Sequence, residues 1–187
     1  WNDVRVRKAV SIAIDRRELA ASWRGGLGFF PPTLLLSPDL GGQWGLPTAE
    51  LLQTPGFRRP HSVDEEASKQ LFKEAGVDPT TLEPVYLYTA FLADFGEAMQ
   101  AQLSKIGLKL KTKVTATGVI NNDELTKGNF DISWSTGGTT FDDPADLLLE
   151  LVGTQGNKNL GIWKFPEIDQ LAIEQDRTLD PTKRREL

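Results

Sequence analysis

Strand-like and helix-like segments alternate along residues 62–134, and this alternation constrains the fold more than any other feature of the sequence. The strand-like segments are short and rich in β-branched and aromatic residues, whereas the helix-like segments carry apolar residues at helical spacing and end at a glycine. The expected helices cover residues 62–75, 95–106 and 118–127, and the expected strands cover residues 84–89, 108–114 and 130–134. Strands joined through helices pair in parallel, so the sequence predicts an α/β fold whose mixed, mostly parallel sheet is flanked by helices.

Two residue pairs have the spacing of a capping box, in which an N-cap side chain and a glutamate three residues later satisfy helix amides. Asp15 and Glu18 form the first pair, which predicts that a helix over residues 4–14 is followed directly by a second helix. Ser62 and Glu65 form the second pair and would start the helix that ends at residue 75.

The rest of the chain contains one long irregular segment and several short elements. Residues 28–61 are rich in glycine and proline and are expected to form a long ordered loop. After residue 142 the pattern predicts a helix through residue 151, a short strand at residues 161–163 and a helix over residues 166–178.

Composition excludes several classes of function. Lys and Arg total 21 and Asp and Glu total 26, and a chain with this net charge of -5 lacks the basic face that nucleic-acid phosphates require. Cysteine is absent and His61, expected at the surface, is the only histidine, so we expect no metal site, no cofactor and no catalytic triad. No apolar run approaches the ~18 residues that a membrane-spanning helix needs.

Both ends are interpreted as cuts within a longer protein. Trp1 leads directly into a helical pattern, and Asp180 and Pro181 open a helix shortly before the last residue.

Four segments carry motifs in a fixed order. They are VRVRKAV to AIDR at residues 4–16, ASKQL with EAG at residues 67–76, QAQLSKIGL at residues 100–108, and GNFDISW with DP at residues 128–144. Asn159, Trp163, Pro166, Glu167, Asp169 and Arg184 follow. Together these segments resemble family 5 of the bacterial solute-binding proteins, which are the peptide, nickel and oligosaccharide receptors of ABC importers.

The resemblance implies that residues 1–187 form a single lobe of the periplasmic-binding-protein-like type II fold, within a two-lobed receptor. It implies a non-enzymatic protein that captures a small solute, a peptide or a similar polar molecule, in a cleft between its lobes. It also implies delivery to the permease subunits of an ABC transporter, and a location in the periplasm or on the cell surface as a lipoprotein.

The expected ligand-binding segment follows the strand at residues 130–134 and enters the next helix. Ligands of open α/β sheets bind outside the carboxyl ends of the strands, and two adjacent glycines permit close approach of the backbone to a ligand. The residues assigned to ligand binding are Trp134, Ser135, Thr136, Gly137, Gly138, Thr139, Thr140, Phe141, Asp142, Phe29 and Phe30. Two alternatives stay open, in which Asp142 is only a helix N-cap and Trp134 is only a core residue.

The segment departs from the resembled family at one position. Peptide-binding members often place an aspartate four residues before the proline of the DP motif, where it pairs with the ligand's amino group, but Thr140 stands there. An uncharged threonine cannot make a charge-assisted bond of that strength. An oligosaccharide receptor of the same family is therefore the alternative, with a hydrolase on a similar α/β scaffold as the competing class.

Overall fold

The computed structural model describes residues 1–22, 35–133, 142–161 and 164–187. The chain divides into two compact units, which we describe separately. The first unit comprises Trp1–Pro32 and Thr48–Ser135, and the second comprises Thr33–Pro47 and Thr136–Leu187. The expectation of a single lobe over residues 1–187 stays a prediction.

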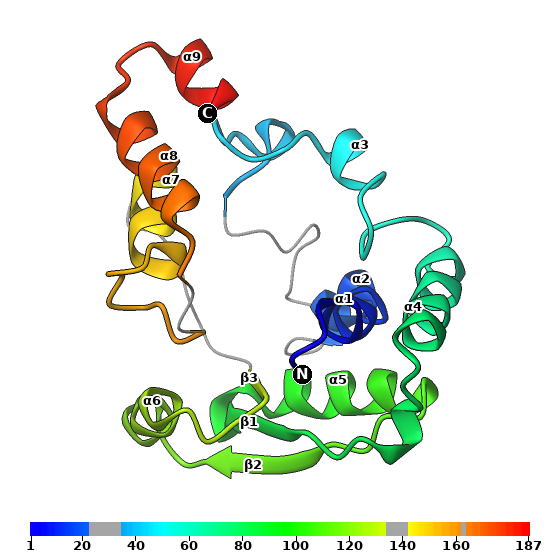
Figure 1. Cartoon of the computed structure of the whole chain (residues 1–187). Coiled ribbons are helices and arrows are strands. Elements are labelled where there is room, and N and C mark those ends of the chain that lie inside the picture. Colours follow the sequence, from blue (N-terminus) through cyan, green and yellow to red (C-terminus); the bar gives the residue numbers. More distant parts are fainter. Residues whose placement is uncertain (23–34, 134–141, 162–163) are drawn as a thin grey trace. The chain divides into compact units, whose positions relative to one another are not determined.

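The first unit contains a parallel sheet, which lies next to helices α5 (Ala93–Lys105) and α6 (Gly118–Lys127), as Figure 1 shows. Its strands are β1 (Val85–Thr89), β2 (Lys111–Thr115) and β3 (Ile132–Ser133), in the order β2-β1-β3. Helix α5 connects β1 to β2, and α6 connects β2 to β3. The α/β architecture with parallel pairing is confirmed, and β1 is the most buried strand because it has a neighbour on each side.

The strand predicted over residues 108–114 begins later than its alternating pattern suggests. Leu108 is buried in the core before the strand starts, and pairing begins where Val85 lies opposite Lys111. The lysines of β2 are held by carboxylates, with Lys111 Nζ 2.7 Å from Glu83 and Lys113 Nζ 2.5 Å from Glu124.

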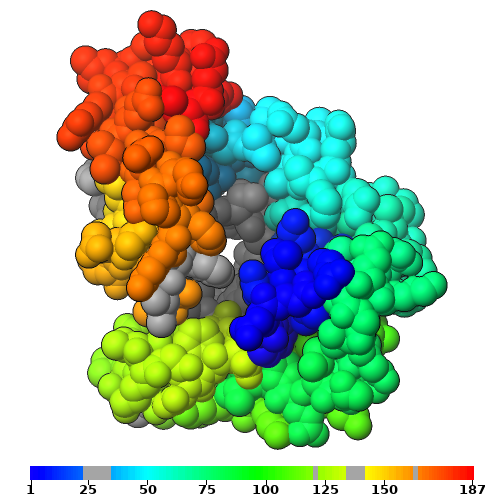
Figure 2. All heavy atoms as spheres, viewed as in Figure 1, coloured from blue at the N-terminus to red at the C-terminus, as the bar shows by residue number. Residues whose placement is uncertain are grey.

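Helix α1 (Val4–Ile12) packs against α4 (Ser62–Ala75), and their atoms lie in contact in Figure 2, blue against green. The interface is mostly apolar but includes a buried hydrogen bond in which Ser68 Oγ donates to Ala9 O at 2.8 Å. Arg5 Nη1 donates to Glu74 O at 2.7 Å at the end of α4. The core of this unit consists of Val6, Ala9, Val10, Ala13, Leu19, Phe72, Tyr86, Tyr88, Met99, Leu103 and Leu108.

The first two helices meet as predicted, whereas the start of α4 differs from the prediction. Helix α2 (Arg16–Ser22) follows α1 and packs against α5. The cap of α4 is His61, which makes no side-chain cap bond, and Ser62 already lies inside the helix. The capping box at Ser62 is therefore wrong, because the amides of Asp64 and Glu65 bond to the His61 carbonyl instead.

The Gly/Pro-rich segment contains local structure in its described part. The first unit includes α3 (Thr48–Leu51), and the second includes the 3-10 turn Pro38–Leu40. Further 3-10 turns in the first unit cover Pro79–Thr81 and Ala90–Leu92.

The second unit is helical in its described part. It contains α7 (Pro144–Leu147), a π-helical turn over Leu148–Val152, α8 (Pro166–Arg177) and α9 (Pro181–Glu186). The predicted helix through residue 151 thus changes its hydrogen-bond pattern after one turn. Most of the strand predicted at residues 161–163 lies outside the described residues. No helix in the described part of the chain is long and apolar enough to cross a membrane.

Helix α5 approaches β1 closely at Gly96, so a substitution at this position tests the packing of the helix on the strand. A Cβ at this position would lie 2.4–2.5 Å from the ring of Tyr88, so we expect Gly96→Ala to destabilise the whole protein by about 1–3 kcal/mol. Gly118→Ala is the matched control, since its Cβ meets nothing within 4 Å and a helical alanine is favoured. Urea unfolding measures the stability of both variants. Equal stabilities of Gly96→Ala and Gly118→Ala would contradict the close packing of α5 on β1.

Candidate functional site

The carboxyl edge of the sheet in the first unit is where the predicted ligand segment begins. Leu87 pairs with Ser133, so β3 ends beside β1 and the chain leaves the sheet at this edge. Because β1, β2 and β3 are parallel, the segments after Thr89, Thr115 and Ser133 all start there. Open α/β sheets bind their ligands at such an edge.

Most of the predicted ligand residues cannot be placed by the structure. Residues 134–141, which cover Trp134 to Phe141, lie outside the described residues, as do Phe29 and Phe30. Asp142 is described, and its assignment to ligand binding stays a prediction.

Asp142 is exposed, and its carboxylate binds a backbone amide of the second unit. Its Oδ2 accepts a hydrogen bond of 2.7 Å from the amide of Gln43. The N-cap of α7 is instead Asp143, whose Oδ1 accepts from the amide of Ala145 at 2.9 Å. The capping alternative for Asp142 is therefore wrong, because Pro144 occupies the first helical position and the extended residue before it becomes the cap.

The carboxylate of Asp143 also forms a bidentate ion pair with Arg184 of α9. Arg184 Nη1 donates to Oδ2 at 2.8 Å and Nη2 donates to Oδ1 at 2.6 Å, which is the strong geometry for these two groups. The hydrogen bonds from Arg184 hold the pKa of the Asp143 carboxyl below its ordinary value, and the cap bond from Ala145 acts in the same direction.

Arg184 makes two further contacts with segments of the second unit that are distant in the sequence. Its Nε donates to Gln175 Oε1 at 2.9 Å, and Gln175 is buried on α8. Its guanidinium carbon lies 4.8 Å from the centre of the Trp44 ring, which is a cation–π contact. Arg184 therefore ties the start of α7 to α8 and to the segment that carries Trp44.

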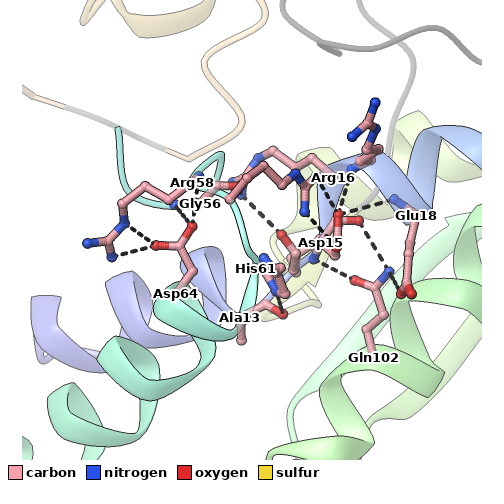
Figure 3. A network of polar contacts seen from close by, with 12 residues as sticks. Ala13, Asp15, Arg16, Glu18, Gly56, Arg58, His61, Asp64 and Gln102 are labelled. Atoms are coloured by element: carbon pink, nitrogen blue, oxygen red, sulfur yellow. Dashed lines mark hydrogen bonds and ion pairs between the residues drawn. The ribbon is translucent and has the colours of Figure 1, made fainter. Parts of the chain in front are cut away.

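In the first unit, Asp15 of the AIDR motif organises a second polar network (Figure 3). Its Oδ1 accepts from the amides of Arg17 and Glu18 at the start of α2, as an N-cap should. Both carboxylate oxygens also accept from Arg59 at 2.8 Å. Asp15 thus caps α2 and fixes the segment before α4 with one side chain.

The capping box predicted at Asp15 is completed by a residue from another helix. The amide of Asp15 donates to Gln102 Oε1 at 2.8 Å, where a capping box would place Glu18. Gln102 Nε2 in turn donates to the Asp15 carbonyl at 3.2 Å and to Glu18 Oε2 at 3.4 Å. The side chain of Gln102, from the QAQLSKIGL motif, therefore bridges α5 to the junction of α1 and α2 (Figure 3).

The neighbouring residues of this network are also engaged in structure. Asp64 is fully buried, and its carboxylate accepts from the amides of Gly56 and Arg58 and from Arg58 Nε at 2.6 Å. Arg16 Nη1 donates to Gly56 O at 3.1 Å and the Arg16 guanidinium lies over the ring of Phe57. These bonds order the irregular segment that precedes α4.

A cavity of about 160 Å³ lies beside Asp15 in the first unit. Its lining mixes carboxylates, a lysine and a histidine, from Ala13, Asp15, Glu18, His61, Glu65, Gln102, Lys105 and Ile106. His61, expected at the surface, is partly exposed, with Nε2 3.2 Å from Ala13 O. Within the described ranges no set of three histidine or acidic side chains is placed to hold a metal ion.

Sequence reasoning missed the partners that hold these motifs together. Arg59, Gln102 and Arg184 lie 44, 87 and 41 positions from the aspartates they bind, so local spacing carries no signal for them. Only the later order of motif residues pointed to Arg184.

Comparison with known proteins decides the family. The model of the bacterial extracellular solute-binding proteins, family 5 Middle, matches residues 1–159. The chain belongs to this family. The family 5 assignment confirms the resemblance drawn from the motifs, and it confirms that the chain comes from a class of binding proteins and not from the competing class of hydrolases.

Two relatives show how much of a family 5 protein the chain represents. It is 27% identical over 198 residues to YgiS of Escherichia coli, named as a probable deoxycholate-binding periplasmic protein, and covers 34% of it. It is 24% identical over 193 residues to the periplasmic oligopeptide-binding protein OppA of Salmonella typhimurium, also covering 34%. All of the chain is matched in both cases, so it spans about a third of the length of these relatives.

Solved structures confirm the fold of a periplasmic binding protein. The open form of the murein tripeptide binding protein MppA superposes with a TM-score of 0.80 at 21% identity, over 98% of this chain and 35% of that one. OppA of Burkholderia pseudomallei gives a TM-score of 0.79 at 20% identity, over 98% and 36%.

The charge of Asp15 should stabilise the fold in a pH-dependent way. Burial alone would raise its pKa, but the hydrogen bonds from Arg59 and from the amides of Glu18 and Arg17 outweigh burial and lower the pKa from 3.8 to about 2. Its charge therefore contributes stability at pH above 4, and this contribution is lost as the pH falls through 2. Asp15→Asn keeps a good cap and should cost about 1–2 kcal/mol at pH 7, allowing for partial exposure.

Urea unfolding at pH 7, 4 and 2.5 measures this effect. The loss of unfolding free energy in Asp15→Asn, relative to the unsubstituted protein, should shrink at the lowest pH. Adding Arg59→Gln to Asp15→Asn should cost little further stability, because both substitutions remove the same ion pair. A difference that stays constant with pH would contradict the role of the charge.

Hydrogen exchange should report the role of Arg184. In Arg184→Gln, the amides of residues 35–47 and 142–147 should exchange at least about tenfold faster, because the ion pair and the ring contact are both lost. Arg185→Gln, at an adjacent exposed position, is the matched control and should leave these rates unchanged. Equal protection in both variants would show that Arg184 does not hold these segments.

Proposed function

We propose that the whole protein is the solute-binding component of an ABC importer, which captures a peptide or a similar polar solute and delivers it to the permease. The observation that carries this proposal is the family 5 match over residues 1–159. The names of OppA and MppA support a peptide as the solute. The family description and the periplasmic relatives support the periplasm or the outside of the cell as the site of action. That the protein is held at the cell surface by a lipid anchor is a further part of the proposal.

The proposed binding segment is residues 134–142, with Phe29 and Phe30. Its position in the chain supports this assignment, because it begins where β3 leaves the carboxyl edge of the sheet. In this proposal the solute binds between two lobes and shifts the equilibrium between open and closed forms. The closed form then docks on the permease.

A solute without a free amino group is a second candidate. Thr140 supports it, because no carboxylate stands at the position where peptide-binding members often hold the ligand's amine. The name of YgiS supports it as well, since deoxycholate has no amine. An oligosaccharide belongs to the same class of solutes.

A thermal-shift screen of the whole protein tests the proposed function. Peptides, oligosaccharides and deoxycholate are compared, and a bound solute raises the melting temperature through mass action. We expect stabilisation by one of these classes. The absence of stabilisation by any of them would contradict a binding role for these solutes.

Substitution of Thr140 separates the two candidates. Thr140→Asp should tighten binding of a peptide with a free amino terminus by about ten- to a hundredfold, since a charge-assisted hydrogen bond is gained. Binding of the same peptide after N-acetylation serves as the control and should not improve. Isothermal titration calorimetry measures both, and equal effects on the two peptides would place the amine away from residue 140.

A further inference from the structure

We propose that the carboxyl edge of the sheet in the first unit binds an uncharged, apolar part of the solute. This inference rests on the proposed function and adds the chemical class of the group that is recognised. It follows from residues that the structure describes at the ends of β1 and β2.

The segments that follow these two strands contain no charged residue. They read TAFLA at residues 89–93 and TATGV at residues 115–119, in a chain in which 25% of the residues are charged. The sequence after β3, residues 134–141, has no charged residue either. The nearest charge along the chain after β1 is Asp94, which lies in the first turn of α5, where the helix amides offset a negative charge.

The amino edge of the same sheet has the opposite character. Glu83 precedes β1 and pairs with Lys111 at the start of β2. Asp131 precedes β3, and its Oδ2 accepts a hydrogen bond of 2.8 Å from the amide of Val85. Charges of this sheet are therefore concentrated at the end that is away from the proposed site.

Large apolar side chains are exposed at the carboxyl edge. Phe91 is 61% exposed in the first turn after β1, and Val119 is 80% exposed at the start of α6, which follows β2. Thr89 and Thr115 are paired partners, so these two turns start from neighbouring points of the edge. Figure 1 shows β2 running toward α6 at this end of the sheet.

The polar groups at this edge are neutral. Ser133 Oγ is buried and has no hydrogen-bond partner among the described residues, and Thr115 Oγ1 donates to Tyr88 O at 3.4 Å. Neutral hydroxyls and an exposed aromatic ring at the same edge of the sheet fit an aliphatic or aromatic group next to an uncharged polar one, such as an apolar side chain and its peptide bond. A carboxylate or ammonium group here would lose its hydration without gaining a counter-charge.

Titration of the whole protein with four tripeptides tests the inference: Ala-Leu-Ala, Ala-Ala-Ala, Ala-Glu-Ala and Ala-Lys-Ala. The leucine peptide should bind at least tenfold more tightly than either charged peptide. Phe91→Ala should weaken binding of the leucine peptide about tenfold. Val63→Ala, which removes an exposed apolar side chain from α4 in the same unit, is the control and should leave this affinity unchanged.

Each other result has a distinct meaning. Equal or tighter binding of a charged peptide would overturn the inference and leave the proposed function intact. An unchanged affinity of Phe91→Ala for the leucine peptide would also overturn it, since the exposed ring would then take no part in binding. Failure of all four peptides and of every solute in the thermal-shift screen would contradict the proposed function, and the inference with it.

Discussion

Parallel pairing of β1 with both neighbours is the constraint on which the first unit depends. A parallel strand can be reached only through a crossover, so α5 and α6 must return the chain to the same starting edge. All three strands consequently finish at one edge, where the chain leaves the sheet after Thr89, Thr115 and Ser133. Because the strands share these two edges, the charged residues can gather at the edge where the strands begin and the neutral residues at the edge where they end.

Two aspartate–arginine pairs order the parts of the chain that have no regular structure. Asp15 and Arg59 act in the first unit, and Asp143 and Arg184 act in the second. In both, one carboxylate caps a helix and accepts a planar guanidinium at the same time, so each holds a helix start and a remote segment together. The motifs that identify the family are therefore largely structural in the described part of the chain.

The sequence predicted the regular elements well because their signals are local. Apolar periodicity located α5, and the content of β-branched and aromatic residues located β1. Glycines in the left-handed region end α4 and α5, Gly76 with φ 66° and Gly107 with φ 88°. The errors came where tertiary contacts replaced local ones, as when Gln102 took the role expected of Glu18 and Asp143 took the cap expected of Asp142. The ligand residues were inferred from chain order and resemblance, and among them the described structure includes only Asp142.

The position of Arg184 bears on how this protein can be divided for recombinant expression. The family match ends at residue 159, but the guanidinium that binds Asp143 lies 25 residues later, on a separate helix. A boundary drawn at the end of the match would remove Gln175 and Arg184 together. The Asp143 carboxylate would then lack its counter-ion, and the cation–π contact with Trp44 would be lost. The stretch that must be kept intact is thus set by a side-chain contact and not by the extent of sequence similarity.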